Sequence, residues 1–240
     1  MVWSEHVFEY CERGSSSAFW AEPLNAVSNV GFVVAGLAAA AMLARTKSTP
    51  PAHRFSVFLS VMLLVVGAGS FLFHTFATRW AELADQIPIT IFVFSYFSFA
   101  IVFLLDIGWR SAAVVIAVFA ALSFVANGIG CTPPSPDTAP GDRVCLWGSV
   151  AYFPALAGIW IIGGLLWRMN RQTAAGILAA AAVFTLSLAL RTVDTPLCDN
   201  TVWFGKAIGT HFAWHLLNAC TLFILVRTAA RHDSRSGLPT

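Results

Sequence analysis

Seven apolar segments constrain the fold of this chain more than any other feature. They cover residues 25–44, 55–76, 86–105, 111–129, 146–167, 174–192 and 207–227. About 20 consecutive apolar residues let an α-helix cross the hydrocarbon core of a bilayer. A transmembrane β-strand is about half as long and alternates apolar with polar side chains, which these segments do not do. The sequence therefore predicts an all-α polytopic membrane protein, a bundle of seven transmembrane helices.

The composition agrees with a membrane location and excludes other classes. Hydrophobic residues make up 58% of the 240 residues and charged residues only 11%, which is more apolar than a soluble domain. The basic residues form no stripe interleaved with aromatic residues, so nucleic acid is not an expected partner. We expect a single domain over residues 1–240. Residues 1–24 form an acidic arm that lacks the apolar core of a cleavable signal peptide.

The charged residues between the segments predict the orientation of the chain. Seven crossings place the two termini on opposite sides, and one side collects most of the basic residues, namely Arg45, Lys47, Arg54, Arg110, Arg168, Arg171, Arg227, Arg231 and Arg235. The positive-inside rule therefore predicts an extracytoplasmic N-terminus and a cytoplasmic C-terminus. All acidic residues except Asp106 and Asp233 fall on the outer side. Both a bacterial inner membrane and a eukaryotic secretory membrane agree with the sequence.

Three histidines lie at the same depth in this topology. His74 is near the end of the second segment, whereas His211 and His215 are near the start of the seventh. Residues four apart share one face of an α-helix, so His211 and His215 point the same way and His74 can complete the site. A lone membrane histidine is often a packing residue, but this spacing and depth favour a metal. Zinc is the expected ion, since three histidines with an open fourth position suit it.

Ser70 and Asp85 are the expected catalytic residues. Ser70 lies one helical turn before His74, and Asp85 lies at the same depth near the start of the third segment. Each also has an ordinary explanation, because membrane serines often bond their own backbone and an Asp three residues before Pro88 resembles a helix N-cap. Beside a zinc ion, Asp85 would transfer a proton and Ser70 would hydrogen-bond the oxyanion. The predicted reaction is hydrolysis of an amide or ester, with a lipid favoured as substrate if the site opens into the membrane.

Six motifs, taken in order along the chain, resemble those of the alkaline ceramidases. They are FEYCER, AEPLNAVSN, GSFLFH, ADQIP, RTVDTPLCD and GTHFAWH. That family lies within a superfamily of seven-helix membrane hydrolases that includes the progestin and adiponectin receptor-like proteins. The resemblance covers nearly the whole chain. It implies that His74, His211 and His215 bind zinc, that Ser70 and Asp85 serve catalysis, and that a ceramide-like membrane lipid is cleaved to a sphingoid base and a fatty acid.

The resemblance also implies a calcium site in the N-terminal arm. The family binds calcium through an acidic segment, whose counterpart here supplies Glu9, Glu12 and Glu22. Carboxylates and backbone carbonyls are the ligands that this hard cation prefers. The family motif typically begins with Asp-Trp and has Asn where Gly14 stands, so one side-chain ligand is missing in this chain. The alternative is a solvated acidic arm whose Glu22 and Pro23 begin the first helix.

Four of the cysteines map to the outer side, where an oxidising compartment permits disulfides. Cys11, Cys131, Cys145 and Cys198 allow three pairings, and free thiols are a further alternative. The resemblance favours Cys11 with Cys198, which leaves Cys131 with Cys145. Cys220 lies inside the seventh segment.

Other functions would use the same residues differently. A close alternative keeps zinc but hydrolyses another acyl lipid, such as an N-acyl amine or a phospholipid ester. A second is a non-enzymatic receptor-like or transport protein, although polar residues at one end only argue against transport. A third is haem binding by the membrane histidines. Arg191 and Asp194 lie at the outer level either as an ion pair or as a helix end, and no obligatory protein partner is evident.

Overall fold

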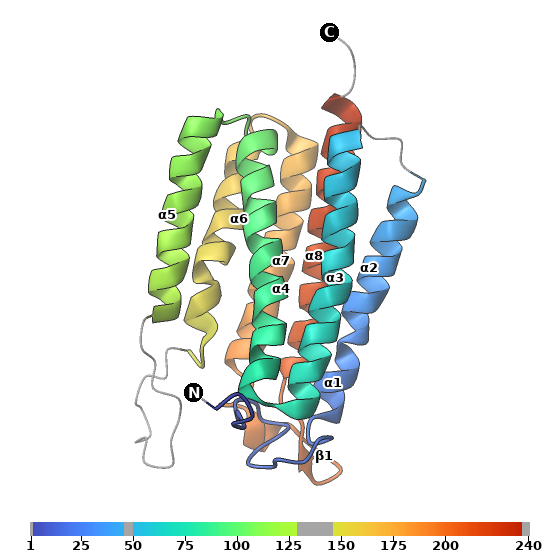
Figure 1. The fold of residues 1–240 in the computed structure, drawn as a ribbon, viewed down its shortest axis with the longest axis vertical. Coiled ribbons are helices and arrows are strands. Elements are labelled where there is room, and N and C mark those ends of the chain that lie inside the picture. The colour runs from blue at the N-terminus through green and yellow to red at the C-terminus, as the bar shows by residue number, and fades with distance from the viewer. Residues whose placement is uncertain (1, 46–49, 129–145, 237–240) are drawn as a thin grey trace.

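The computed structural model describes residues 2–45, 50–128 and 146–236. Its helices run roughly parallel to one another, with the N-terminal arm at one end of the bundle and the last turns of the C-terminal helix at the other (Figure 1). The helices are α1 (Pro23–Ser28), α2 (Val30–Leu43), α3 (Pro50–Phe76), α4 (Arg79–Phe99), α5 (Trp109–Gly128), α6 (Phe153–Leu166), α7 (Arg171–Thr192) and α8 (His211–Ser236).

Short elements complete the chain. A π-helical turn η1 (Ala100–Leu104) extends α4, and 3-10 turns η2 (Ser149–Tyr152) and η3 (Cys198–Asn200) precede α6 and follow α7. Strands β1 (Val202–Trp203) and β2 (Lys206–Ala207) form a small antiparallel hairpin. The described residues contain seven helical spans long and apolar enough to cross a membrane, with α1 and α2 together making the first. The prediction of an integral membrane protein built from seven helices is confirmed.

The core of the bundle lies around α8, which is the most buried of the seven spans. It packs against α7, α2 and α3 through residues such as Leu222 and Val226. Helix α5 is the least buried span and stands at the edge of the bundle (Figure 1). Its outward side chains are apolar, with Phe124 80% exposed, and an apolar outer face suits contact with lipid rather than water.

The third span differs from its prediction in where it begins. Helix α4 starts at Arg79, so Asp85 lies inside the helix rather than ahead of it. The predicted boundary was late because Glu82, Asp85 and Gln86 make the first two turns polar, although these turns continue the same helix. Polar turns at the end of a span can lie at the interface, where charged and polar side chains are tolerated.

The N-terminal arm packs against the end of the bundle through a few buried side chains, although most of its described residues are exposed. Val7 packs with Phe73 and Ala81, and its backbone N–H donates to the carbonyl of Ala77 at 2.8 Å. A disulfide joins Cys11 to Cys198, as the family resemblance implied, with 5.4 Å between the Cα atoms. The expected pair Cys131 and Cys145 lies outside the described residues.

Candidate metal centre and catalytic site

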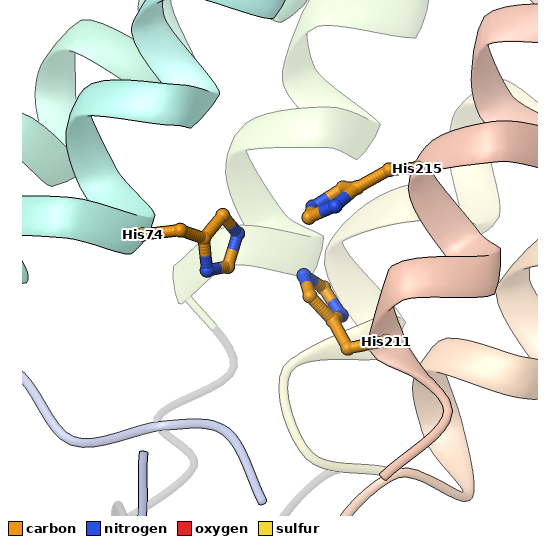
Figure 2. A group of neighbouring side chains, drawn as sticks. All are labelled: His74, His211 and His215. Atoms are coloured by element: carbon orange, nitrogen blue, oxygen red, sulfur yellow. The ribbon is translucent and has the colours of Figure 1, made fainter. Parts of the chain in front are cut away.

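The three histidines converge at one end of the bundle. His74, in the last turn of α3, points toward His211 and His215 of α8 (Figure 2). One ligand atom from each ring lies within 4.8 Å of the others, and the ring centroids are 4.6 to 5.1 Å apart. All three side chains are buried. In the described part of the chain, this is the one group of three or more His, Cys, Asp or Glu residues that could hold a metal ion.

Neighbouring side chains fix the orientation of two of these rings. The Nδ1–H of His74 donates to the carboxylate of Glu22 at 2.6 Å. The Ser28 hydroxyl donates its only proton to the carbonyl of Asn25, so its oxygen accepts from Nδ1–H of His215 at 2.7 Å. With Nδ1 protonated, the lone pair of each ring is on Nε2 and free to bind a metal.

This donor set fits a zinc ion. Three imidazoles that are buried together, two of them oriented by outer partners, are the arrangement of a metal site with an open fourth position. Nδ1 of His211 has no hydrogen-bond partner in the described structure, and packing alone gives no reason for three rings to gather in a buried space. Glu22 serves here as the outer partner of His74 rather than as a calcium ligand.

Glu22 carries the negative charge that a hydrogen-bond partner of His74 needs. Burial by itself would raise the pKa of the Glu22 carboxyl. The adjacent His74 and hydrogen bonds from His74, Asn25 and Arg13 outweigh burial and lower the pKa below its ordinary value. Glu22 is therefore ionised, which favours the Nδ1–H tautomer of His74.

Ser70 and Asp85 lie beside a close approach of α3 and α4. The Ser70 hydroxyl lies near enough to the Asp85 carboxylate to interact with it. Gly69 makes this approach possible, because a Cβ on Gly69 would lie 2.1 Å from the carbonyl oxygen of Ala84. That carbonyl lacks its usual helical donor, since Pro88 four residues later has no N–H.

Asp85 is not a helix cap. Residue Thr78 holds the N-cap position of α4, and Asp85 lies two turns further in. Its Oδ1 atom is buried without a hydrogen-bond partner in the described structure. A carboxylate held inside a membrane helix, with one oxygen unengaged, is suited to exchange a proton with a bound molecule.

Two further residues cover and brace the cluster, and the sequence reasoning did not select the first of them, Tyr10. Tyr10 of the arm stacks on the ring of His211, with centroids 3.7 Å apart and an interplanar angle of 22°. Asp194 is buried and accepts from the backbone N–H groups of Cys11, Thr210 and His211 at 3.0, 2.6 and 2.8 Å. Asp194 thereby ties the arm to the first turn of α8, next to the disulfide.

Arg191 and Asp194 do not pair with each other in the described residues. The Arg191 guanidinium donates to the carbonyl of Trp147 at 2.7 Å and to the Ser149 hydroxyl at 3.1 Å. It also lies 5.2 Å from the ring centroid of Tyr152. Asp194 instead interacts with a helix end, because it accepts the backbone N–H groups at the start of α8.

The three glutamates of the expected calcium site do not come together. The carboxylate of Glu12 accepts the backbone N–H groups of Leu24 and Asn25, each at 2.8 Å, and so caps α1. The carboxylate of Glu22 is bonded to Arg13, His74 and Asn25. Glu9 instead lines a cavity of about 500 Å³. The described structure therefore does not gather the three carboxylates around one point, because those of Glu12 and Glu22 are bonded to other groups and Glu9 faces a cavity. The calcium site stays a prediction.

A cavity of about 500 Å³ adjoins the metal cluster without including it. It lies between the arm, α4, α5 and the start of α6, and Tyr10 and Arg191 are part of its wall. A smaller apolar cavity of about 60 Å³ continues deeper between α4, α6, α7 and α8. Four residues line both cavities, namely Ile89, Val93, Tyr152 and Ala155. The larger cavity, which has polar residues on its wall, is therefore next to the smaller apolar one.

Comparison with protein families gives a match over nearly the whole chain. The model of the family described as Ceramidase matches residues 5–236, which include most of the arm, all three histidines, Ser70 and Asp85. Comparison with individually curated proteins gives no significant match.

Proposed function

Because the chain belongs to the ceramidase family, we propose that it is a zinc-dependent intramembrane amidase that cleaves the N-acyl bond of ceramide-like lipids. The products are a sphingoid base and a fatty acid. The observation that carries this proposal is the buried group of His74, His211 and His215, with Asp85 and Ser70 at the same end of the bundle. Family membership also favours a hydrolase over a receptor-like protein, a transport protein or a haem protein.

The residues of the chain divide the chemistry among them. His74, His211 and His215 would hold the ion, which supplies a Lewis acid that polarises a carbonyl group and lowers the pKa of water. Asp85 accepts the proton of the attacking water and passes it to the amide nitrogen. The water oxygen bonds to the carbonyl carbon, and the C–N bond breaks. The Ser70 hydroxyl, which is beside Asp85 in the free protein, turns to donate to the carbonyl oxygen as it gains charge.

The cavities support an amphiphilic substrate. The larger one lies within the range of about 300 to 1,000 Å³ usual for small-molecule sites. Gln86, Thr90 and Asn127 place polar groups on its wall between α4 and α5, where hydroxyl and amide groups of a lipid head can bind. The deeper cavity is lined by side chains such as Phe92, Phe184 and Leu222, which suit an alkyl chain.

The orientation in the membrane is part of the same proposal. The arm lies at one end of the bundle (Figure 1). The disulfide joins the arm to the loop after α7, and His74 and His211 contact Tyr10 of the arm, so the histidine cluster is at the same end. We assign this end to the extracytoplasmic side. The excess of basic residues at the other end supports this assignment. A disulfide also requires an oxidising compartment, which the cytoplasm is not.

The decisive test measures metal content and fatty-acid release on the same preparations. We expect the wild type in detergent to hold about one zinc per chain and to release fatty acid from an N-acyl sphingoid base. His215→Ala should lose both, because a ligand is removed. His232→Ala is the matched control on the same helix, since His232 lies at the far end of α8 and contacts Thr173.

The result that contradicts the proposal is turnover that persists without bound metal. A panel of N-acyl amines and phospholipid esters, offered to the same wild-type protein, separates a ceramide-like substrate from other acyl lipids. Turnover of only the phospholipid esters would retain the metal site but reject the amidase.

A further inference from the structure

Arg13 lies where the arm meets the end of α3, and its guanidinium is fully buried. Its Nε donates to Oε1 of Glu22. One terminal nitrogen donates to the carbonyls of Ser16 and Ala18 at 3.1 and 3.0 Å. The other donates to the carbonyls of His74 and Thr75 at 2.9 and 3.4 Å. The five N–H groups of this guanidinium therefore face five oxygen atoms.

The same oxygens are typical ligands of a hard cation. One carboxylate and four backbone carbonyls surround the Arg13 charge, and calcium sites are built from such groups. Two of the carbonyls belong to the last turn of α3, where helix carbonyls lack internal partners and the helix dipole favours positive charge. This end of the bundle is thus built to receive a cation, and the cation present is a side chain.

We propose that the buried guanidinium of Arg13 takes the place that calcium was expected to hold in the arm, so that this chain docks its arm without calcium. The hydrogen bonds of the Glu12 and Glu22 carboxylates support this proposal. Glu22 is bonded to Arg13 and His74, and each oxygen of Glu12 accepts a backbone N–H at the start of α1, so both carboxylates are already held by donors of the protein. A divalent ion at this point would have to displace a side chain whose every donor is satisfied.

Arg13 also acts on the metal site through Glu22. One Glu22 oxygen accepts from Arg13 and the other accepts from Nδ1 of His74. Arg13 is thus a positioning residue that holds the outer partner of a zinc ligand. This second part of the inference rests on the proposed zinc site, whereas the replacement of calcium does not.

The first experiment uses the wild-type protein and needs no activity. We measure the thermal midpoint with about 10 mM CaCl₂ or MgCl₂, which is a hundred times the dissociation constant of a weak calcium site of about 0.1 mM. Calcium content is measured after removal of free ions. We expect the same midpoint in both salts and calcium well below stoichiometry. A calcium-specific rise of about 5 °C or more, or one bound calcium per chain, would overturn the inference.

The second experiment compares Arg13→Ala with Arg79→Ala. Arg79 is the matched control, because it pairs with Glu82 at 3.0 Å at the same end of the bundle but is partly exposed. We expect Arg13→Ala to lower the midpoint by about 6 °C or more, since it removes the guanidinium from the buried Glu22 carboxylate and leaves it only its bonds to His74 and Asn25. We expect Arg79→Ala to change it by about 2 °C or less. Equal midpoints for the two variants would reject the role of Arg13.

Measuring zinc affinity shows whether Arg13 positions the partner of a zinc ligand or only stabilises the folded protein. Competition with a chelator should show that Arg13→Ala binds zinc about 10 to 100 times more weakly, as expected when the partner of a ligand is disturbed. Arg13→Lys should recover part of this loss, because it restores the charge but has three donors in place of five. Unchanged zinc affinity in Arg13→Ala would limit Arg13 to the docking of the arm. If Arg13→Ala does not fold, the calcium measurement on the wild type still decides the main claim.

Discussion

At the scale of single residues, each part of the site has a partner that explains its position. His74 is oriented by Glu22, His215 by Ser28, and His211 is stacked under Tyr10. The sequence pointed to the histidines because polar residues in apolar helices are costly unless they have a function. It gave no comparable signal for Ser28 or Tyr10, since a serine after an apolar stretch and an aromatic residue in an arm are common.

The first prediction at this scale concerns Asp85. Asp85→Asn should lower fatty-acid release by about 100-fold to 10,000-fold, because an amide cannot exchange the proton. Zinc content should stay near that of the wild type, since Asp85 is outside the group of potential ligands. Both quantities are measured on the same preparation.

Asp106→Asn is the matched control for this change. Asp106 is exposed in the turn between η1 and α5, and Asn tolerates its positive φ of 52°. Loss of zinc together with activity in Asp85→Asn would show that Asp85 binds the metal rather than moving a proton.

At the scale of secondary-structure elements, the contact between α3 and α4 decides whether Ser70 and Asp85 meet. Gly69 and Pro88 act together there. Pro88 leaves the carbonyl of Ala84 without a helical donor, and Gly69 has no side chain to collide with it. A glycine permits close packing in any helix, but the sequence does not indicate which helix approaches Gly69. That depends on how the helices pair, which local patterns do not encode.

The prediction at this scale is that Gly69→Ala separates the two helices. The added Cβ would lie 2.1 Å from a backbone oxygen of α4, and backbone cannot move aside cheaply. We expect a loss of about 2 kcal/mol or more in stability, measured by thermal unfolding, together with reduced fatty-acid release.

Gly164→Ala in α6 is the control, because nothing lies within 4 Å of the Cβ it would add. It should leave stability unchanged or raise it by up to about 1 kcal/mol, since alanine is the better helix former. A Gly69→Ala protein as stable and active as Gly164→Ala would mean that close approach of α3 and α4 is not needed.

At the scale of the whole molecule, the arm and the last outer loop close the site over the helix ends. The Cys11–Cys198 disulfide links residues 187 positions apart, and Asp194 bonds both the arm and the start of α8. Gly209, with a φ of +64°, lies against Asp194 and Cys11, where any side chain would collide. The arm therefore holds Tyr10 over His211 through several independent contacts.

The prediction at this scale concerns the disulfide. Cys198→Ser should lower the thermal midpoint, because a crosslink over so long a loop contributes up to about 5 kcal/mol in the chain-entropy model. Zinc should also dissociate faster, since Tyr10 is no longer held over His211. Thermal unfolding and the rate of zinc transfer to a chelator measure the two effects.

Cys220→Ser is the control, because Cys220 is an exposed free thiol on α8. It should behave as the wild type in both measurements. If Cys198→Ser matches Cys220→Ser, the non-covalent contacts of the arm are sufficient by themselves.

The sequence by itself determined the membrane class, the seven helices and the identity of the three histidines. These follow from the length of apolar runs and from the helical period, which are local properties of the chain. Only the tertiary structure decided what the charged groups of the arm do. Glu12 caps α1, Glu22 orients His74, and Arg13 holds the end of α3. A carboxylate binds whichever donors the fold brings near it, and His74, which is 52 positions from Glu22 in the chain, reaches that carboxylate only after folding.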